Sequence, residues 1–331
     1  MNSAVPIKLV SHYFLLALLL FSCKDAPNAS PDLSIEQEAK PLERSVSLVV
    51  LGTVQDAGSP QIACDKECCK DLFDNPDHTR KVVALGVVDH EYKKSYLLEA
   101  TPNVGEQLKA LDGFSPSFSK PIPDGIFLTH AHIGHYTGLI YIGYEALNAT
   151  QLAVYAMPKM RSFLSTNGPW DQLISKENIV FKHLEESKTE VLSPSLAITP
   201  ILVPHRDEYS ETVGYIIEGV SKSALFIPDI DKWARWEESI VDVMADVDYA
   251  FVDATFYDNE EINHRDISEI PHPFVIESMA LFDDLPVDER KKIHFIHLNH
   301  TNPLLNKESP QYKEVLSRGY NVAEFHQIIA L

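Results

Sequence analysis

From Ser45 onward, short apolar runs alternate with stretches of helical spacing. The apolar runs predict strands at Val46–Leu51, Val82–Val88, Ser95–Glu99, Gly125–Thr129, Ala153–Ala156, Ile179–Leu184, Ala197–Val203, Val213–Glu218, Ala224–Ile227, Tyr249–Val252 and Ile293–Leu298. The helical stretches are Val104–Leu111, Thr137–Leu147, Lys232–Met244, Pro273–Phe282 and Pro310–Ser317. Because helices are interspersed with strands throughout, we expect two packed sheets with helices on the outside.

The first 22 residues follow a different pattern. A single charge, Lys8, precedes a leucine-rich apolar run that ends at Phe21. This run is shorter than the roughly 20 residues that span a bilayer, and it has the form of a signal peptide. Its end, Leu20-Phe21-Ser22-Cys23, resembles a bacterial lipobox, in which Cys23 becomes the lipidated first residue. An ordinary secretory signal with an incidental cysteine is the alternative.

The sequence therefore predicts three parts. Residues 1–22 form a lipoprotein signal peptide, and residues 23–45, rich in proline and acidic residues, form a lipidated N-terminus and flexible tether. Residues 46–331 form one domain. We expect an exported bacterial protein anchored to a membrane through the lipid on Cys23.

Composition and net charge indicate which kinds of molecule the protein can bind. The 331 residues are 45% hydrophobic and 23% charged, which is typical of a globular chain with a large core. They include 28 basic and 48 acidic residues, for a net charge of −20. Such a surface repels phosphate backbones, so we expect a small-molecule substrate and no nucleic acid.

A histidine cluster follows the apolar run that begins at Gly125. His130, His132 and His135 fall within six residues. On a loop that leaves a strand, His130 and His132 can converge on one ion, while His135, in the first turn of a following helix, can face a neighbouring ion. Imidazole is a suitable ligand for zinc. The alternative is a surface histidine run, in a chain with 14 histidines.

Three later strands end in further potential ligands. His205 follows Val203-Pro204, Asp229 follows Ile227-Pro228, and His297 follows Phe295-Ile296. Strand ends line one rim of a sheet sandwich, so these side chains could meet. Taken singly, each has an ordinary structural explanation, such as a loop histidine or a helix cap.

Taken together, these residues resemble the metallo-β-lactamase-fold hydrolase superfamily, over roughly Ser45 to the C-terminus. Thr129, His130, His132, His135 and Gly138 match its histidine motif; His205, Asp229 and His297 match its later ligands. The resemblance implies an α+β four-layer αββα sandwich as a single domain. It also implies one ion on His130, His132 and His205, a second on His135 and His297, and Asp229 as a bridge.

The chain departs from this family at Gly134, where the motif has an aspartate. We therefore expect a second site with three protein ligands, weaker than the first. The chemistry implied is metal-assisted hydrolysis, in which an ion lowers the pKa of bound water to about 7 and the resulting hydroxide attacks a carbonyl or phosphoryl group.

Three cysteines, Cys64, Cys68 and Cys69, form a second cluster. Three thiolates and one histidine make a closed tetrahedral zinc site, and His300, three residues after His297, is the candidate fourth ligand. The alternative is a disulfide, Cys68–Cys69 or Cys64–Cys68, formed outside the cytoplasm.

This cluster resembles a subgroup that contains the carbon-phosphorus-lyase-pathway phosphodiesterase and the pyrroloquinoline-quinone biosynthesis protein B. The Cys-x3-Cys-Cys spacing departs from that subgroup's usual pattern. The resemblance implies a structural zinc here, His272 as an acid or supporting residue, and Asp253 as a residue that orients a metal-bound histidine. For His272, a structural role between two prolines is the alternative.

Three functions follow from these features. The first is a membrane-tethered, metal-dependent hydrolase of a small ester or phosphodiester, with one or two catalytic Zn2+ ions. The second is a protein like the quinone biosynthesis protein B, oxidative and iron-using. The third is a binding lipoprotein with a vestigial metal site.

Overall fold

The computed structural model describes residues 46–115, 118, 121–262 and 267–331, and these belong to one compact unit that ends at Leu331. The predicted signal peptide, the lipidated Cys23 and the tether to residue 45 lie outside the described residues. Within the described part of the chain, no helix has the length and apolar character needed to cross a membrane.

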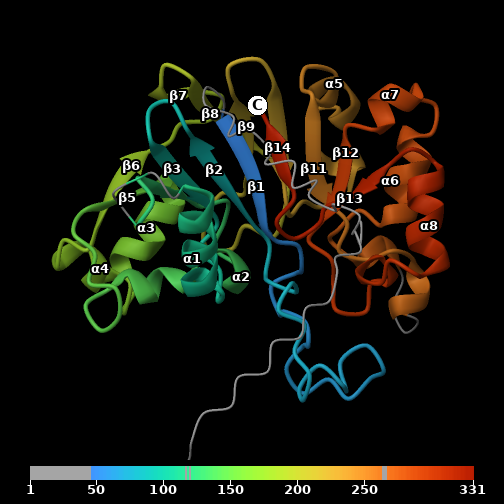
Figure 1. The fold of residues 1–331 in the computed structure, drawn as a ribbon, viewed down its shortest axis with the longest axis horizontal. Helices are drawn as coiled ribbons and strands as arrows, with labels where there is room; N and C mark the ends of the chain where they lie inside the picture. The colour runs from blue at the N-terminus through green and yellow to red at the C-terminus, as the bar shows by residue number, and fades with distance from the viewer. Residues whose placement is uncertain (1–45, 116–117, 119–120, 263–266) are drawn as a thin grey trace, which may run out of the picture. The chain divides into compact units, whose positions relative to one another are not determined.

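Two seven-stranded mixed sheets form the centre of the domain (Figure 1). The first has the order β14-β1-β2-β3-β4-β5-β6, with β14 (Ile328–Ala330), β1 (Val46–Gly52), β2 (Ala84–Asp89), β3 (Lys94–Leu98), β4 (Gly125–Phe127), β5 (Leu152–Ala156) and β6 (Ile179–His183). The second has the order β13-β12-β11-β10-β9-β8-β7, with β13 (Asn321–Val322), β12 (Ile293–Ile296), β11 (Tyr249–Asp253), β10 (Ser223–Ile227), β9 (Val213–Glu218), β8 (Leu196–Leu202) and β7 (Glu190–Ser193).

Helices cover the outer faces of the two sheets (Figure 1). Those from the first half of the chain are α1 (Val104–Phe114), α2 (Ile133–Tyr136), η1 (Thr137–Ile142), α3 (Pro158–Thr166) and α4 (Asp171–Ser175). Those from the second half are η2 (Trp233–Arg235), α5 (Ile240–Ala245), η3 (Asn259–Ile262), η4 (Ile267–Glu269), α6 (Val275–Phe282), α7 (Val287–Arg290), η5 (Pro303–Leu305) and α8 (Pro310–Ser317). The predicted αββα sandwich is confirmed.

The uninterrupted apolar runs are explained by burial on both faces. In β1, Leu48 and Val50 point into the core between the sheets, whereas Val49 and Leu51 point into the core beneath the helices. A strand in the middle of a four-layer sandwich has no solvent face, so its sequence does not alternate between apolar and polar residues.

Two predicted helices were wrong in extent. The predicted helix Thr137–Leu147 begins earlier, at Ile133, and continues as the 3-10 segment η1. The predicted helix Lys232–Met244 is two short pieces, η2 and α5, because Trp236 Nε1 donates to Leu202 O (2.9 Å) and Ser239 caps a new helix. An amphipathic pattern across two separate elements imitates one longer helix.

Candidate metal centre

The candidate ligands follow strands that end at the same edge of the sandwich. Strands β3 and β4 are parallel, and two antiparallel pairings give β1 the same direction as β3. In the second sheet β10, β11 and β12 are parallel, and β8 shares their direction. An isolated bridge between Val54 and Leu298 joins the two sheets at this edge.

The histidine loop after β4 packs closely against the end of β3. A β-carbon on Gly138 would lie 2.0 Å from Thr101 O, so only glycine fits there. The close approach allows Gly138 N to donate to Ala100 O (2.8 Å) and Ala100 N to donate to His135 O (2.9 Å). This packing fixes the direction of His135 and explains why the histidine motif ends in glycine.

The first donor set is His130, His132, His205 and Asp229. His132 Nδ1 lies 2.9 Å from His130 Nε2 and 3.3 Å from His205 Nε2. Asp229 Oδ2 lies 3.3 Å from His130 Nε2 and 3.2 Å from His205 Nε2. Three imidazole nitrogens and one carboxylate oxygen therefore face a common point, as the sequence predicted for the first ion.

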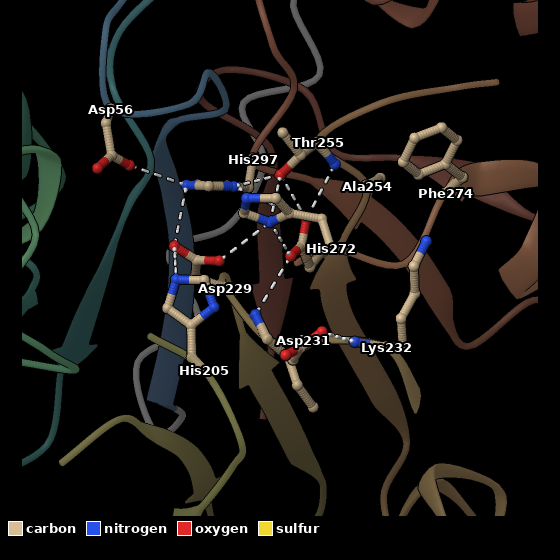
Figure 2. Close-up of polar contacts among 12 residues, drawn as sticks. Asp56, His205, Asp229, Asp231, Lys232, Ala254, Thr255, His272, Phe274 and His297 are labelled. Carbon is tan, nitrogen blue, oxygen red and sulfur yellow. Dashed lines mark hydrogen bonds and ion pairs between the residues drawn. The ribbon is translucent and has the colours of Figure 1, made fainter. Parts of the chain in front are cut away.

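The second donor set is Asp56, His135, Asp229 and His297. Asp56 Oδ1 lies 3.0 Å from His135 Nε2 and 3.1 Å from His297 Nε2. Asp229 Oδ2 lies 3.9 Å from His135 Nε2 and 4.0 Å from His297 Nε2. The same oxygen of Asp229 thus serves both sets, and Figure 2 shows Asp56, Asp229, His297 and His272 turned toward one another.

Asp56 is a donor of the second set that no sequence pattern indicated, and it changes the expectation of a three-ligand second site. A β-carbon on Gly134 would lie 2.5 Å from Asp56 Cα and 2.7 Å from Asp56 Cγ. The loop after β1 therefore occupies the space that an aspartate at position 134 would need. Nothing local in the sequence pairs these two positions, so only the folded structure shows the replacement.

A third group of four donors contains Asp253 and His272 together with Asp229 and His297. His272 Nδ1 lies 2.9 Å from Asp253 Oδ2 and 3.1 Å from Asp229 Oδ1. The Thr255 hydroxyl donates to Asp253 Oδ1 (2.7 Å) and lies 2.8 Å from His297 Nδ1. Asp253 thus orients His297 through Thr255, which leaves His297 Nε2 free for an ion.

Buried and half-exposed carboxylates support other ligands. Glu99 is fully buried at the end of β3, and its Oε2 lies 3.5 Å from His135 Nδ1. Glu208 Oε2 lies 3.3 Å from His132 Nε2. The sequence analysis missed both, although an acid that directly follows the apolar run SYLL is an unusual pattern. Glu99 (φ 81°) and His297 (φ 64°) both have left-handed backbone, a strain that proteins tolerate at functional sites.

The carboxylates gathered at the centre favour positive charge on the groups around them. Burial alone would lower the pKa of His272 and His297, but the surrounding carboxylates raise it to about 10 and about 9. Asp56 and Glu99 likewise outweigh burial and raise the pKa of His135 well above its usual value. Without a cation, protons on these three histidines offset part of the negative charge of the centre. Nitrogen and carboxylate donors in this number suit Zn2+ or Fe2+.

The three cysteines and His300 also come together. Each offers a donor atom within 4.8 Å of the others, and all three thiols are free. Burial and the neighbouring thiols raise the pKa of Cys68 to about 12. Burial would also raise the pKa of Cys64, but the backbone N–H of Lys66 and the other two thiols lower it. Cys64 is thus the thiol that most readily becomes a thiolate ligand.

Comparison with known proteins places the chain in a family. The family model for the beta-lactamase superfamily domain matches residues 94–297. The chain belongs to the beta-lactamase superfamily. It is 25% identical to coenzyme PQQ synthesis protein B of Methylococcus capsulatus over 304 residues, which cover 83% of this chain and 96% of that protein. Its identity to the Pseudomonas fluorescens counterpart is also 25%, with the same coverage.

Solved structures of this superfamily share the fold. The Zn2+-bound PqqB of Methylobacterium extorquens superposes with a TM-score of 0.71 at 22% identity, covering 86% of this chain and all of that one. A diphosphatase from the PhnP family superposes with a TM-score of 0.61 at 20% identity, covering 86% of this chain and 97% of that one. The predicted resemblance to the superfamily and to this subgroup is confirmed.

Proposed function

We propose that this protein is a dinuclear metalloenzyme similar to coenzyme PQQ synthesis protein B, acting oxidatively with iron on a small organic molecule. The observation that carries the metal assignment is the sharing of Asp229 Oδ2 between two complete four-donor sets. The similarity to PQQ synthesis protein B along 83% of the chain supports the choice of an oxidative reaction over hydrolysis. A vestigial site would not be expected to keep every ligand of both sets.

The side chains of the centre differ in how far solvent reaches them, and this separates ion ligands from groups that can meet a substrate. His130, His135, His205 and His297 are 0–1% exposed in their side chains and can only hold ions. The side chains of His132 (14%), Asp56 (12%) and His272 (12%) are reached by solvent, so a substrate approaches from their side. An ion bound here supplies Lewis acidity, acidifies water and, if it is iron, supplies redox chemistry.

His272 is placed to exchange a proton with the substrate. Its Nδ1 is engaged by Asp229 and Asp253, so Nε2 is the atom left for a substrate. The two carboxylates hold the imidazole in one orientation and favour its protonated form. Asp253 also fixes His297 through Thr255, so one carboxylate sets the position of an ion ligand and of the proton carrier.

Hydrolysis of a small ester or phosphodiester is the second candidate. Two ions held close together by the shared Asp229 oxygen would supply the clamp on attacking and leaving oxygens that two-metal hydrolysis uses. The predicted lipid anchor on Cys23 remains a proposal, and labelled fatty-acid incorporation into wild-type and Cys23→Ala protein would test it.

The experiment that separates the two reactions uses the purified chain loaded with either Zn2+ or Fe2+. We expect iron-dependent dioxygen uptake with an aromatic quinone precursor, and its loss in His132→Ala. Hydrolysis of bis-p-nitrophenyl phosphate, strongest with Zn2+, would instead establish the second candidate. The matched control is His183→Ala, an exposed histidine on β6. If the wild-type chain binds ions but neither reaction occurs, both proposals are wrong.

A further inference from the structure

We propose that metal bound at Cys64, Cys68, Cys69 and His300 holds Asp56 in the second donor set, so that the second catalytic ion binds tightly only when the cysteine site is filled. This inference rests on the dinuclear centre proposed above. It assigns the cysteine cluster a positioning role in the active centre, in addition to stabilising a loop.

The two metal sites are joined by two short segments of chain. Asp56 belongs to the catalytic centre, and Cys64, eight residues later, belongs to the cysteine cluster. His297 belongs to the catalytic centre, and His300, three residues later, belongs to the cysteine cluster. Each segment therefore carries one ligand to each site. A metal in the cysteine cluster cross-links the far ends of both segments.

The chain before Asp56 is paired to the rest of the sandwich, whereas the backbone hydrogen bonds of the chain after it are local until Lys81. Gln55 N donates to Leu298 O (2.9 Å) and Leu298 N donates to Thr53 O (2.8 Å), which anchors the backbone up to Gln55. Asp56 is the first residue beyond this pairing. It lies near the start of a segment, 55–81, that contains no helix or strand and runs as turns from Asp56 to Ala63.

Segment 55–81 also lacks an apolar core of its own. Between Val54 and Val82, Cys69 is the one buried apolar side chain. Two of its three large apolar residues, Ile62 and Phe73, are 83% and 52% exposed. A segment that buries so little apolar surface cannot offset its loss of conformational entropy, and a structural metal is the usual remedy. Figure 1 shows this segment projecting from the sheets below β1.

Asp56 depends on that order because burial removes water from its carboxylate, and its contacts with His135 and His297 offset that cost only while the side chain stays in place. Its side chain is 12% exposed, and the favourable contacts that hold it are with His135 and His297. If segment 55–81 loosens, the carboxylate gains hydration by leaving. Gly134 has no side chain that could replace it. The second set would then retain three donors, and outer positioning groups of this kind change metal affinity by about 10- to 100-fold.

Cobalt titration of the metal-free full chain tests the inference, because thiolate ligation gives Co2+ a strong near-ultraviolet charge-transfer band that histidine and carboxylate ligation lack. We expect three ions per wild-type chain, with the thiolate band saturating before the last ion binds. Cys64→Ser/Cys68→Ser should lose the band and bind the second catalytic ion about 10- to 100-fold more weakly. Asp56→Asn should weaken the same ion while keeping the band.

The inference is overturned if the cysteine variant binds both catalytic ions as tightly as the wild type, or if the thiolate band in the wild type fills last. The order of filling uses the unaltered chain, so it decides the matter even if the variant does not fold. Activity is not the readout. A chain that shows this order but catalyses neither reaction would contradict the proposed function and leave the coupling in place.

Discussion

The Cα of Asp56 lies 2.5 Å from the point where a β-carbon on Gly134 would stand. No pair of non-bonded carbons in a protein is that close, so any side chain at position 134 forces the loop after β1 to move. The second donor set of the centre therefore depends on the absence of a side chain on one element and the presence of a carboxylate on another.

Restoring an aspartate at position 134 should damage the wild-type chain and be tolerated when Asp56 is removed. Gly134→Asp should destabilise the fold by about 1–3 kcal/mol through overpacking and displace Asp56. In Gly134→Asp/Asp56→Gly the side-chain overlap is gone, the loop can shift, and the second ion should return. Urea unfolding and metal content measure both effects, with Gly105→Asp, at a position where a β-carbon meets nothing within 4 Å, as the matched control. Full stability and a full complement of ions in Gly134→Asp alone would contradict this account.

Glu99→Gln should weaken the second ion without unfolding the protein. The change removes a buried negative charge 3.5 Å from His135 Nδ1 but keeps the shape of the side chain. We expect about a 10-fold loss of affinity, measured by competition with a chromophoric chelator. Glu106→Gln, an exposed acid paired with Lys81, is the control. Equal affinities in the two variants would show that Glu99 does not support the ligand.

His294 should make the protein less stable in mild acid. Burial lowers the pKa of His294 from 6.5 to about 4, so the unfolded chain binds its proton more readily than the folded chain does. Above about pH 6.5 this group does not lower the free energy of unfolding. The free energy of unfolding then falls as the pH drops toward 4, and the loss is about 2 kcal/mol at pH 5. Urea unfolding of the metal-loaded protein at pH 8 and pH 5 measures it. His294→Phe, which retains stacking on Phe251, should show a smaller difference between the two pH values, and an unchanged difference would refute the assignment.

Tyr215→Phe should cost about 1–3 kcal/mol of unfolding free energy. Tyr215 is fully buried between the sheets, and its hydroxyl donates to Leu128 O, two residues before His130. The substitution leaves a buried carbonyl without its partner at the base of the histidine loop. Chemical denaturation gives the energy, and Tyr209→Phe, at a 63% exposed position, is the control. A loss no greater than that of the control would count against the role assigned to this hydrogen bond.

The sequence was sufficient for the features that are local in the chain. Apolar runs fixed the position of most strands, and ligand-type residues directly after them indicated His130, His205, Asp229 and His297. Helix extents failed where a tertiary hydrogen bond, such as Trp236 to Leu202, divided one amphipathic pattern into two elements.

Asp56 and Glu99 could not be recognised in the same way, because their roles come from contacts across the fold. Asp56 lies 79 or more residues from every ligand it meets, in a segment whose sequence is that of an ordinary turn. Matching the histidine motif residue by residue places Gly134 where the motif has an aspartate, and so predicts a second metal site that lacks one ligand. The compensating carboxylate becomes visible only when the ends of β1, β4 and β12 are brought to one edge.

The mutual exclusion of Asp56 and a side chain at position 134 also constrains how such a protein could have arisen. The two carboxylates cannot occupy the same space, so a lineage that exchanges one for the other cannot pass through an ancestor that carries both in place. One permitted route crosses a form with neither, which would hold one ion firmly and the other weakly. Relatives that still have that intermediate form should have a small residue at both positions, and they would show what chemistry the single remaining ion can sustain.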